Sequence, residues 1–351
     1  VNSLMFENLC SEAIKNLNIL ILEENIGIPQ QVSILNSLNL LADLNKLLRF
    51  LEELRTGNIF IEGNPSVHEI ANEKIKVIAD VLSYNVVDYL KKVFSSMGYE
   101  IKDDVVNSAN YLVPQKRERF MVLGIKRKYL KDQNIEFPDP LINENILVST
   151  VHDAISDLEN IAPEKEIKPN FNPQLLNINE NSKTRLFNYY RSDMQDQNLI
   201  YNHVNTESKQ TSMERFEVLD KMNIGSRNFH SLPDELKHNT YSNADRTQNT
   251  VYLKLQYELP SPTVINVRKS MWQHPTKPRA VSIREAARLQ SFKDDFIFLG
   301  SKDQQYQQIG NAVPPLMARA VAEQILGYLG KEVRRPINVE LLNEEVLNTG
   351  R

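Results

Sequence analysis

The chain has 351 residues, 41% of them hydrophobic, and a formal net charge of −4. This length suffices for about two domains, and the charge excludes a surface covered in basic residues, so nucleic acid would have to bind in a local groove. The single cysteine, Cys10, excludes a disulfide framework and cysteine-based zinc sites, and it fits a reducing intracellular compartment. Neither a signal peptide nor an apolar run of about 18 residues is present, which predicts a chain that does not enter a membrane.

Predicted strands and helices alternate in the first 130 residues. Short apolar runs bounded by polar residues predict the strands, and apolar residues at helical spacing predict the helices. The strands are expected at 18–22, 58–61 and 120–125, and the helices at 38–54 and 70–97. This order predicts an α/β fold with a mostly parallel sheet covered by helices.

Residues 131–270 have a different composition. They are rich in Asn, Gln, Ser and Pro and have weaker periodicity. We therefore expect a second, irregular domain, with a poorly ordered middle near residues 160–215. The tail after Gly330 is charged and is expected to be peripheral.

Two blocks near the C-terminus carry clear local signals. Ser282 can cap a helix in which Glu285 stands three residues further on, and this spacing predicts a capping box. Gly310 and Asn311 predict a tight turn, and the two prolines that follow suit the first turn of a helix expected over 315–326.

A third block leads into the predicted strand at 120–125. Gln115, Arg117 and Arg119 fall on alternate residues, so on a strand their side chains share one face. Two guanidiniums on one face suit contacts with phosphate and base oxygens. An isolated Gln-x-Arg-x-Arg is more often a solvated basic edge or a salt-bridge cluster, so the neighbouring blocks decide between the two interpretations.

The three blocks, at 107–119, 282–292 and 308–318, together resemble the corresponding blocks of the DNA (cytosine-5) methyltransferases. The resemblance covers residues 17–327 and is most specific from residue 107 onward. It implies an α/β fold: a Rossmann-like, S-adenosylmethionine-dependent methyltransferase sheet, here without its first unit, and a smaller, irregular target-recognition domain. The implied domains are a partial catalytic domain at 1–130, the target-recognition domain at 131–281, C-terminal blocks that return to the catalytic domain at 282–330, and a tail at 331–351.

The family's chemistry implies a carboxylate that supports the target base. These enzymes transfer a methyl group from S-adenosylmethionine to C5 of a cytosine flipped out of duplex DNA, and a glutamate contacts the base at N3 and the exocyclic amine. Glu62 follows a predicted strand, as the family's Glu-Asn-Val does, although Gly63 departs from that pattern. Glu7, in Glu-Asn-Leu, matches more closely but would require a long insertion before Gln115. Beside Glu62, the resemblance gives catalytic roles to Arg117 and Arg119.

The resemblance also implies a cysteine nucleophile that adds to C6 of the base. The family places it in a Pro-Cys-Gln loop, and the loop at the same place here has Gln30 where the cysteine belongs. Glutamine has no ionisable nucleophile. Cys10 lies in a helix-like context before the predicted strand, where a lone cysteine is most often a small core residue.

Contacts with the cofactor and with DNA are implied for residues of the second half. Asn311 and Val313 match the block that lies beside S-adenosylmethionine in the family. Cations are concentrated between Lys254 and Arg288, with only two acidic residues among them, which indicates a basic groove for DNA. For any single one of these residues, an ordinary charged surface is the alternative interpretation. The residues expected to contact DNA are Gln115, Lys254, Arg268, Arg279 and Arg288.

Three hypotheses follow from the sequence. The first is a divergent or truncated DNA (cytosine-5) methyltransferase of a restriction-modification system, located in a bacterial or phage-like cytoplasm at the nucleoid. The second is a non-catalytic subunit that binds double-stranded DNA or a partner protein. The third is one half of a split enzyme, in which a second polypeptide supplies the first strand and the thiol that Gln30 cannot provide.

Overall fold

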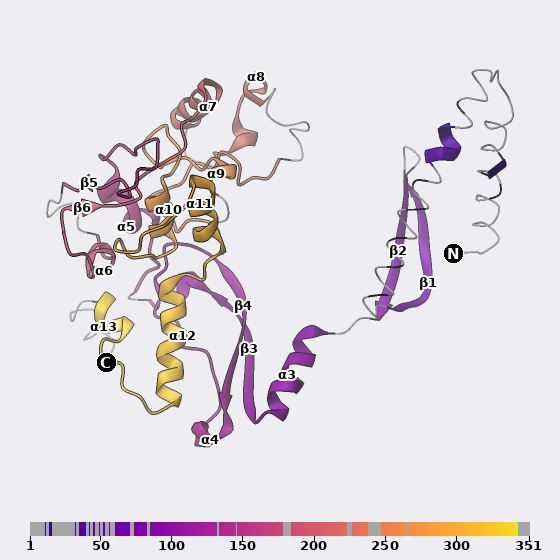
Figure 1. Ribbon diagram of the computed structural model, residues 1–351, viewed down its shortest axis with the longest axis horizontal. Helices are drawn as coiled ribbons and strands as arrows, with labels where there is room; N and C mark the ends of the chain where they lie inside the picture. Colours follow the sequence, from indigo (N-terminus) through magenta and orange to yellow (C-terminus); the bar gives the residue numbers. More distant parts are fainter. Residues whose placement is uncertain are drawn as a thin grey trace. The chain divides into compact units, whose positions relative to one another are not determined.

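The computed structural model describes most of the chain from residue 60 onward (Figure 1). The described ranges are 60–70, 74–82, 85–131, 133–144, 146–177, 184–222, 227–237, 247–264 and 267–342, with residues 35–39 and scattered single or paired helical positions before residue 57. The chain divides into two compact units, Val1–Met97 and Gly98–Arg351, and each unit is described by itself. Among the described residues, every helix is too short or too polar to span a bilayer.

The first unit contains a β-hairpin and a helix. Strands β1 (Phe60–Ile70) and β2 (Lys74–Leu82) pair antiparallel, with a register shift between Glu62 and Ser66. Gly63 lies in this shift with a φ of +72°, a left-handed conformation that glycine adopts without steric cost. Helix α3 (Val86–Ser96) begins where the side chain of Asn85 accepts hydrogen bonds from two backbone amides of its first turn.

The predictions for the first unit are confirmed only in part. The helix expected over 70–97 is wrong for residues 74–82, which form β2. Lysine alternates with β-branched residues at the start of this segment, and such a period of two favours a strand. The strand expected at 58–61 is found from Phe60 onward and continues to Ile70. The predicted strand at 18–22 lies outside the described residues, whereas the described positions within 38–54 are helical.

Unit 2 holds the remaining elements. Its strands are β3 (Tyr99–Asn107), β4 (Glu118–Lys126), β5 (Gln174–Leu175) and β6 (Leu199–Ile200). Its α-helices are α4 (Arg127–Leu130), α5 (Val151–Ile155), α6 (Phe187–Arg191), α7 (Gln210–Lys221), α8 (Asp234–Lys237), α9 (Val267–Ser270), α10 (Ile283–Leu289), α11 (Lys302–Asn311), α12 (Pro315–Tyr328) and α13 (Ile337–Leu341). Short 3-10 helices lie at Ser108–Tyr111 (η1), Ser156–Leu158 (η2) and Phe229–Ser231 (η4).

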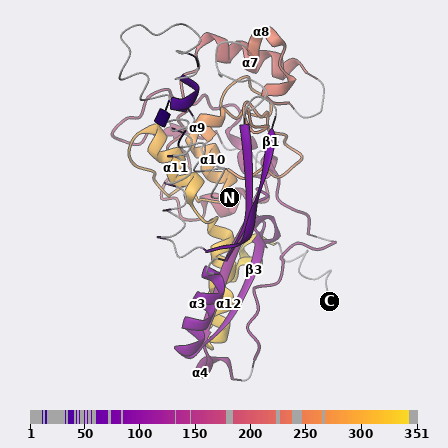
Figure 2. The same cartoon turned by 90° about the vertical axis from the view of Figure 1, so that its right-hand side faces the viewer.

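The β3–β4 hairpin is covered on one face by helix α12. The strands pair antiparallel, and Leu123 and Ile125 of β4 pack with Val321 and Ile325 of α12 (Figures 1 and 2). β4 confirms the strand predicted at 120–125. The described strands form three antiparallel pairs, so they do not form the mostly parallel sheet expected from the sequence.

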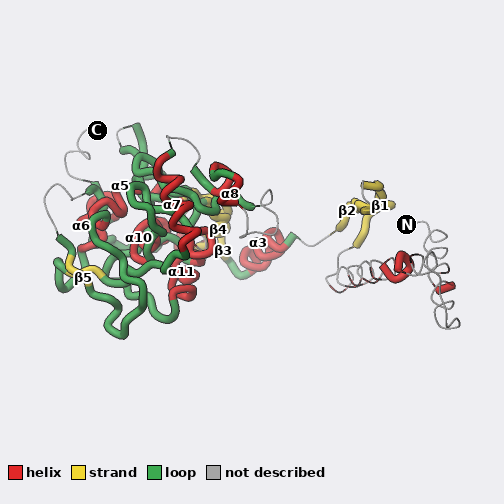
Figure 3. Tube along the Cα trace, turned by 90° about the horizontal axis from the view of Figure 1, so that it is seen from above, coloured by secondary structure: helices red, strands yellow, loops and turns green. Residues whose placement is uncertain are grey.

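The main core of unit 2 surrounds helix α10. Each residue of this helix is buried, and Trp272, Tyr190 and Phe298 are among the large side chains that are almost fully buried in unit 2. The described residues of 131–281 consist mostly of loops with short helices, as the predicted irregular domain requires (Figure 3). These loops still form a dense interior because aromatic and aliphatic residues from many short segments meet there.

Three sequence expectations for unit 2 need correction. The segment 160–215 was expected to be poorly ordered, yet in its described part Ile200 and Val204 are fully buried. The tail was expected to be peripheral, yet α13 buries Ile337 and Leu341 in the main core. The tight turn expected at Gly310 and Asn311 starts later, because these two residues are the last of α11.

Candidate functional site

A buried chain of amides joins the three sequence blocks of unit 2. The backbone NH of Val264 donates to Oε1 of Gln115 at 2.6 Å, and Nε2 of Gln115 donates to Oε1 of Gln290 at 3.0 Å. Nε2 of Gln290 then donates to the carbonyl of Ile309 at 2.9 Å. Both glutamine side chains are fully buried, so these bonds form where water does not compete. Gln115 therefore organises the site from within and is not exposed for a contact with DNA.

Arg117 fixes the same junction with its guanidinium. Nη1 donates to the carbonyl of Val264 at 2.8 Å, and Nη2 donates to the carbonyl of Gly310 at 2.9 Å. Burial of the guanidinium and the nearby charge of Arg119 lower the pKa of Arg117 to about 10, so the side chain remains charged at neutral pH. The bond to Gly310 holds the end of α11 beside the residues that lead into β4.

Arg119, Asn311 and Val313 are site candidates from these blocks that solvent can reach. Arg119 is half-buried, and Nη1 donates to the neighbouring carbonyl of Glu118 at 2.7 Å. Asn311 is exposed at the end of α11, and Val313 is 46% exposed just after it. Because Arg117 holds Gly310, the structure brings the two segments that contain these three residues together.

Arg288 holds the interior together and is not placed for DNA. It is fully buried, Nε and Nη2 donate to the two carboxylate oxygens of Asp294 at 2.9 and 2.7 Å, and Nη1 donates to Asp157 at 2.6 Å. Burial opposes the charge, but the two carboxylates outweigh it and raise the pKa of Arg288. Tyr190 lies under the guanidinium, with 5.0 Å from its ring centroid to Cζ.

Arg279 is held in a similar way by Glu285. Its two terminal nitrogens donate to the two carboxylate oxygens at 2.9 and 2.7 Å, which is the bidentate geometry that arginine favours. The backbone NH of Ser282 also donates to Glu285 at 2.7 Å, which completes the predicted capping box of α10. Burial acts to raise the pKa of Glu285, but the contacts with Arg279 outweigh it and keep the carboxyl ionised.

Three of the cations expected to form a basic groove between residues 254 and 288 are instead paired inside the protein. Lys254 is buried and forms an ion pair with Asp220, while Arg279 and Arg288 are bound to the carboxylates described above. Composition alone missed this because most of the neutralising carboxylates lie outside the cation-rich segment. The side chain of Arg268 lies outside the described residues.

The expected catalytic residues belong to two different units of the chain. Glu62 is exposed on β1 opposite Asp80, in unit 1, whereas Arg117 and Arg119 belong to unit 2. Within unit 1, Glu62 has the surroundings of a surface glutamate. The nucleophile position Gln30, its alternative Cys10 and the rival carboxylate at residue 7 lie outside the described residues.

Two histidines, His203 and His274, are buried beside α10. Nε2 of His203 donates to the carbonyl of Ile161 at 2.9 Å, so Nδ1 accepts the hydrogen bond from the hydroxyl of Ser282, also at 2.9 Å. Nε2 of His274 lies 3.7 Å from a carboxylate oxygen of Glu285. Burial disfavours the imidazolium form and lowers the pKa of His274 to about 4. No signal in the sequence marks His203, whereas His274 belongs to the cation-rich segment between Lys254 and Arg288.

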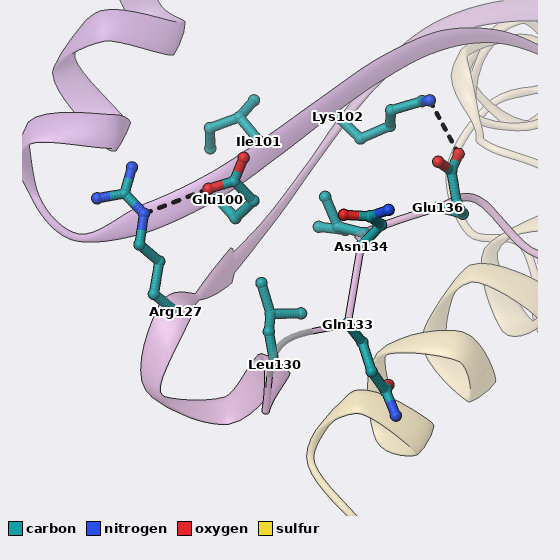
Figure 4. A pocket seen from close by; sticks show the side chains of 9 residues that line it. Glu100, Ile101, Lys102, Arg127, Leu130, Gln133, Asn134 and Glu136 are labelled. Carbon is teal, nitrogen blue, oxygen red and sulfur yellow. Dashed lines mark hydrogen bonds and ion pairs between the residues drawn. The ribbon is translucent and has the colours of Figure 1, made fainter.

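An open hollow of about 520 Å³ lies at the other end of the β3–β4 hairpin (Figure 4). Its rim carries two ion pairs, Arg127 with Glu100 at 3.2 Å and Lys102 with Glu136 at 2.9 Å. Because β3 begins and β4 ends here, the hollow is at the opposite end of the strands from the Gln115 junction. Its charges neutralise one another, so it is not part of the candidate site.

Comparison with solved structures gives the fold. A protein described as a prophage-encoded DNA modification methyltransferase of E. coli aligns with a TM-score of 0.50 and 22% sequence identity, over 70% of this chain and 65% of that one. This likeness supports an α/β methyltransferase fold. A family model for C-5 cytosine-specific DNA methylases matches residues 48–327. The chain belongs to this family.

Relatives of known class agree with this assignment. The chain is 34% identical over 233 residues to the type II methyltransferase M1.HphI of Haemophilus parahaemolyticus. This alignment covers 66% of this chain and 50% of the relative. It is 31% identical over 268 residues to M.DdeI of Desulfomicrobium norvegicum, with coverages of 73% and 60%. A stretch of 77 residues is 51% identical to M.AgeI of Thalassovita gelatinovora, which is 21% of this chain and 18% of that protein. The chain thus spans about half to three fifths of the first two relatives.

Proposed function

We propose that this chain serves in the methylation of cytosine C5 in duplex DNA, with S-adenosylmethionine as the methyl donor, in a restriction-modification system of a bacterial or phage-like cytoplasm. The observation that carries the proposal is the buried amide chain from Gln115 through Gln290 to Ile309. It joins the three blocks by which the sequence resembles the family. The β3–β4 hairpin and α12 then belong to the edge of a Rossmann-like sheet, and the described residues of 131–281 form the target-recognition domain.

Within this proposal the residues of the blocks divide into two groups. Gln115 and Arg117 are positioning residues, because the amide of Gln115 and both terminal nitrogens of Arg117 form hydrogen bonds inside the protein. Arg119 keeps donors accessible to solvent and is the guanidinium that we assign to the phosphate or base oxygens of DNA.

The end of α11 fits the cofactor in part. The exposed amide of Asn311 offers a donor and an acceptor, and Val313 offers an apolar surface for a nucleoside. When bound, S-adenosylmethionine would supply the methyl group. Asn311 and Val313 would contact it from the side that Arg117 holds in place through Gly310.

Two candidate functions remain, and they differ in whether this chain supplies the nucleophile for methyl transfer. Methyl transfer to C5 requires a nucleophile at C6, and Glu62 is the carboxylate that we propose for support of the base. Gln30, at the cysteine position, favours a second candidate, in which this chain binds DNA and a second polypeptide supplies the thiolate. In the first candidate, Cys10 would have to be the nucleophile, because it is the single cysteine of the chain.

Two measurements on the full chain test the proposal. Gel-shift titration with a short unmethylated duplex measures binding, and tritium-labelled S-adenosylmethionine measures methyl transfer to the same duplex. Transfer that disappears in Cys10→Ala supports the enzyme. Binding without transfer supports the DNA-binding subunit, and transfer restored by a second polypeptide identifies a split enzyme. A chain that fails to bind duplex DNA even at low salt contradicts the proposal in both forms.

A further inference from the structure

A tight turn in the proposed target-recognition domain presents an amide side chain at its tip. The backbone NH of Val251 donates to the carbonyl of Gln248 at 3.0 Å, which places Asn249 and Thr250 at the two central positions of the turn. The side chain of Asn249 is exposed, and its amide forms no hydrogen bond with the described part of the chain. Both its donor and its acceptor therefore face solvent.

The base of this turn is fixed to buried aromatic residues. The backbone NH of Phe229 donates to the carbonyl of Val251 at 2.9 Å, and the indole NH of Trp272 donates to the carbonyl of Thr250 at 2.9 Å. Phe229 and Trp272 are almost fully buried. The tip is therefore held by a packed core, and a fixed position of this kind is what selective recognition requires of a contacting side chain.

A hollow of about 570 Å³ lies beside the tip and contains no carboxylate in its lining. The lining combines amide, hydroxyl and imidazole side chains from Asn228, Ser231 and His230 with the apolar side chains of Leu253 and Pro262. This surface would not repel a polyanion. Its three polar side chains form hydrogen bonds with the local backbone, which leaves the exposed amide of Asn249 next to an apolar patch.

The chemistry of this surface matches the edge of one kind of base pair. Asparagine forms paired hydrogen bonds with N6 and N7 of adenine, hydroxyl groups bond to several base edges, and apolar side chains contact the methyl group of thymine. The cations expected to contact DNA at Lys254 and Arg279 are instead bound to carboxylates inside the protein. The residues that line the hollow are without a charged carboxylate, lysine or arginine, so neutral side chains are its candidates for sequence selection.

We propose that Asn249 contacts the adenine of an A·T pair in the DNA target, while Leu253 and Pro262 contact the methyl group of its thymine. The inference rests on the proposed function, because it takes duplex DNA as the ligand. It goes further by naming a selecting residue and the base pair that it selects.

Selection from a pool of short random-sequence duplexes tests this inference on the full chain. The wild type should enrich sequences with an A·T pair at one fixed position. Asn249→Ala should lose the preference at that position by roughly ten- to a hundredfold and keep its preferences elsewhere. Gln248→Ala is the matched control, because it removes the neighbouring exposed amide outside the lining, and it should select the same sequences as the wild type. Uracil in place of that thymine should weaken wild-type binding several-fold.

Three other results of the selection experiment would contradict the proposed role of Asn249. It is overturned if Asn249→Ala enriches the wild-type sequences unchanged, or if it weakens binding to all sequences equally while circular dichroism shows an intact fold. A wild type that selects sequences with no fixed A·T pair also overturns it, although the proposed function survives. A wild-type chain that binds no duplex at all contradicts both this inference and the proposed function.

Discussion

Arg284 and Arg288 of helix α10 and Arg119 at the start of β4 have different surroundings, although the sequence pattern suits all three to contacts with DNA. Arg284 and Arg288 are fully buried beside Asp294, whose carboxylate interacts with both. Arg119 is half-buried, with a recorded bond to the carbonyl of its own neighbour. A local density of basic residues therefore indicates where cations occur but not which of them face solvent. Whether a cation faces solvent depends on whether a buried carboxylate pairs with it.

Removal of Arg288 should have the largest effect on stability. Arg288→Ala leaves the carboxylates of Asp294 and Asp157 buried without their main counter-charge, which should reduce the free energy of unfolding by about 3–5 kcal/mol. Urea denaturation followed by circular dichroism measures this loss. Arg119→Ala is the matched control and should leave the midpoint unchanged. Equal urea midpoints for the two variants would contradict the claim that Arg288 stabilises the fold and Arg119 does not.

The histidines beside α10 should make stability fall in mild acid. The pKa of His274 is lowered to about 4 in the folded chain, compared with about 6.5 when unfolded, so the unfolded state binds the proton first as the pH falls. The stabilisation is complete above pH 6.5 and is lost toward pH 4, by about 3 kcal/mol for this group. His274→Gln should flatten the decline, whereas His152→Gln, at an exposed site, should not.

His203 will leave a residual slope in His274→Gln, because burial lowers its pKa as well. Urea midpoints at several pH values between 4 and 7 measure the slope. An unfolding free energy that is constant over this range would contradict the buried, neutral histidines.

Loss of the amide chain should have a smaller effect. Gln290→Ala removes the acceptor of Gln115 and the donor to Ile309 and leaves buried groups unpaired, at a cost of about 1–3 kcal/mol. Gln308→Ala, an exposed amide on α11, is the matched control. If Gln290→Ala is as stable as the control, water or another group satisfies the junction.

Local parts of the fold could be predicted from the sequence. The capping box at Ser282 and Glu285, the strand at 120–125 and the helix that begins at Pro315 depend on neighbouring residues, and all three are confirmed. Residues 74–82 were misassigned because apolar residues in a short segment suit a helix as well as a strand.

The site could be predicted less well, because its contacts join residues that are far apart in the chain. Gln115 was expected to contact DNA, but it is buried and its partner Gln290 is 175 positions away. The burial of Arg288 likewise depends on Asp157, which lies 131 positions before it. Residue spacing along the chain cannot predict such long-range pairs, although the motifs were sufficient to identify the family.

The division of cations between the fold and DNA can be tested most directly by the salt dependence of duplex binding. Arg119→Ala and Lys254→Gln each remove one positive charge from the full chain. The plot of log affinity against log salt should lose about one unit of slope in Arg119→Ala, because one phosphate contact is lost, and should keep its slope in Lys254→Gln, whose cation is paired with Asp220. A reduced slope in Lys254→Gln together with an unchanged slope in Arg119→Ala would contradict the account.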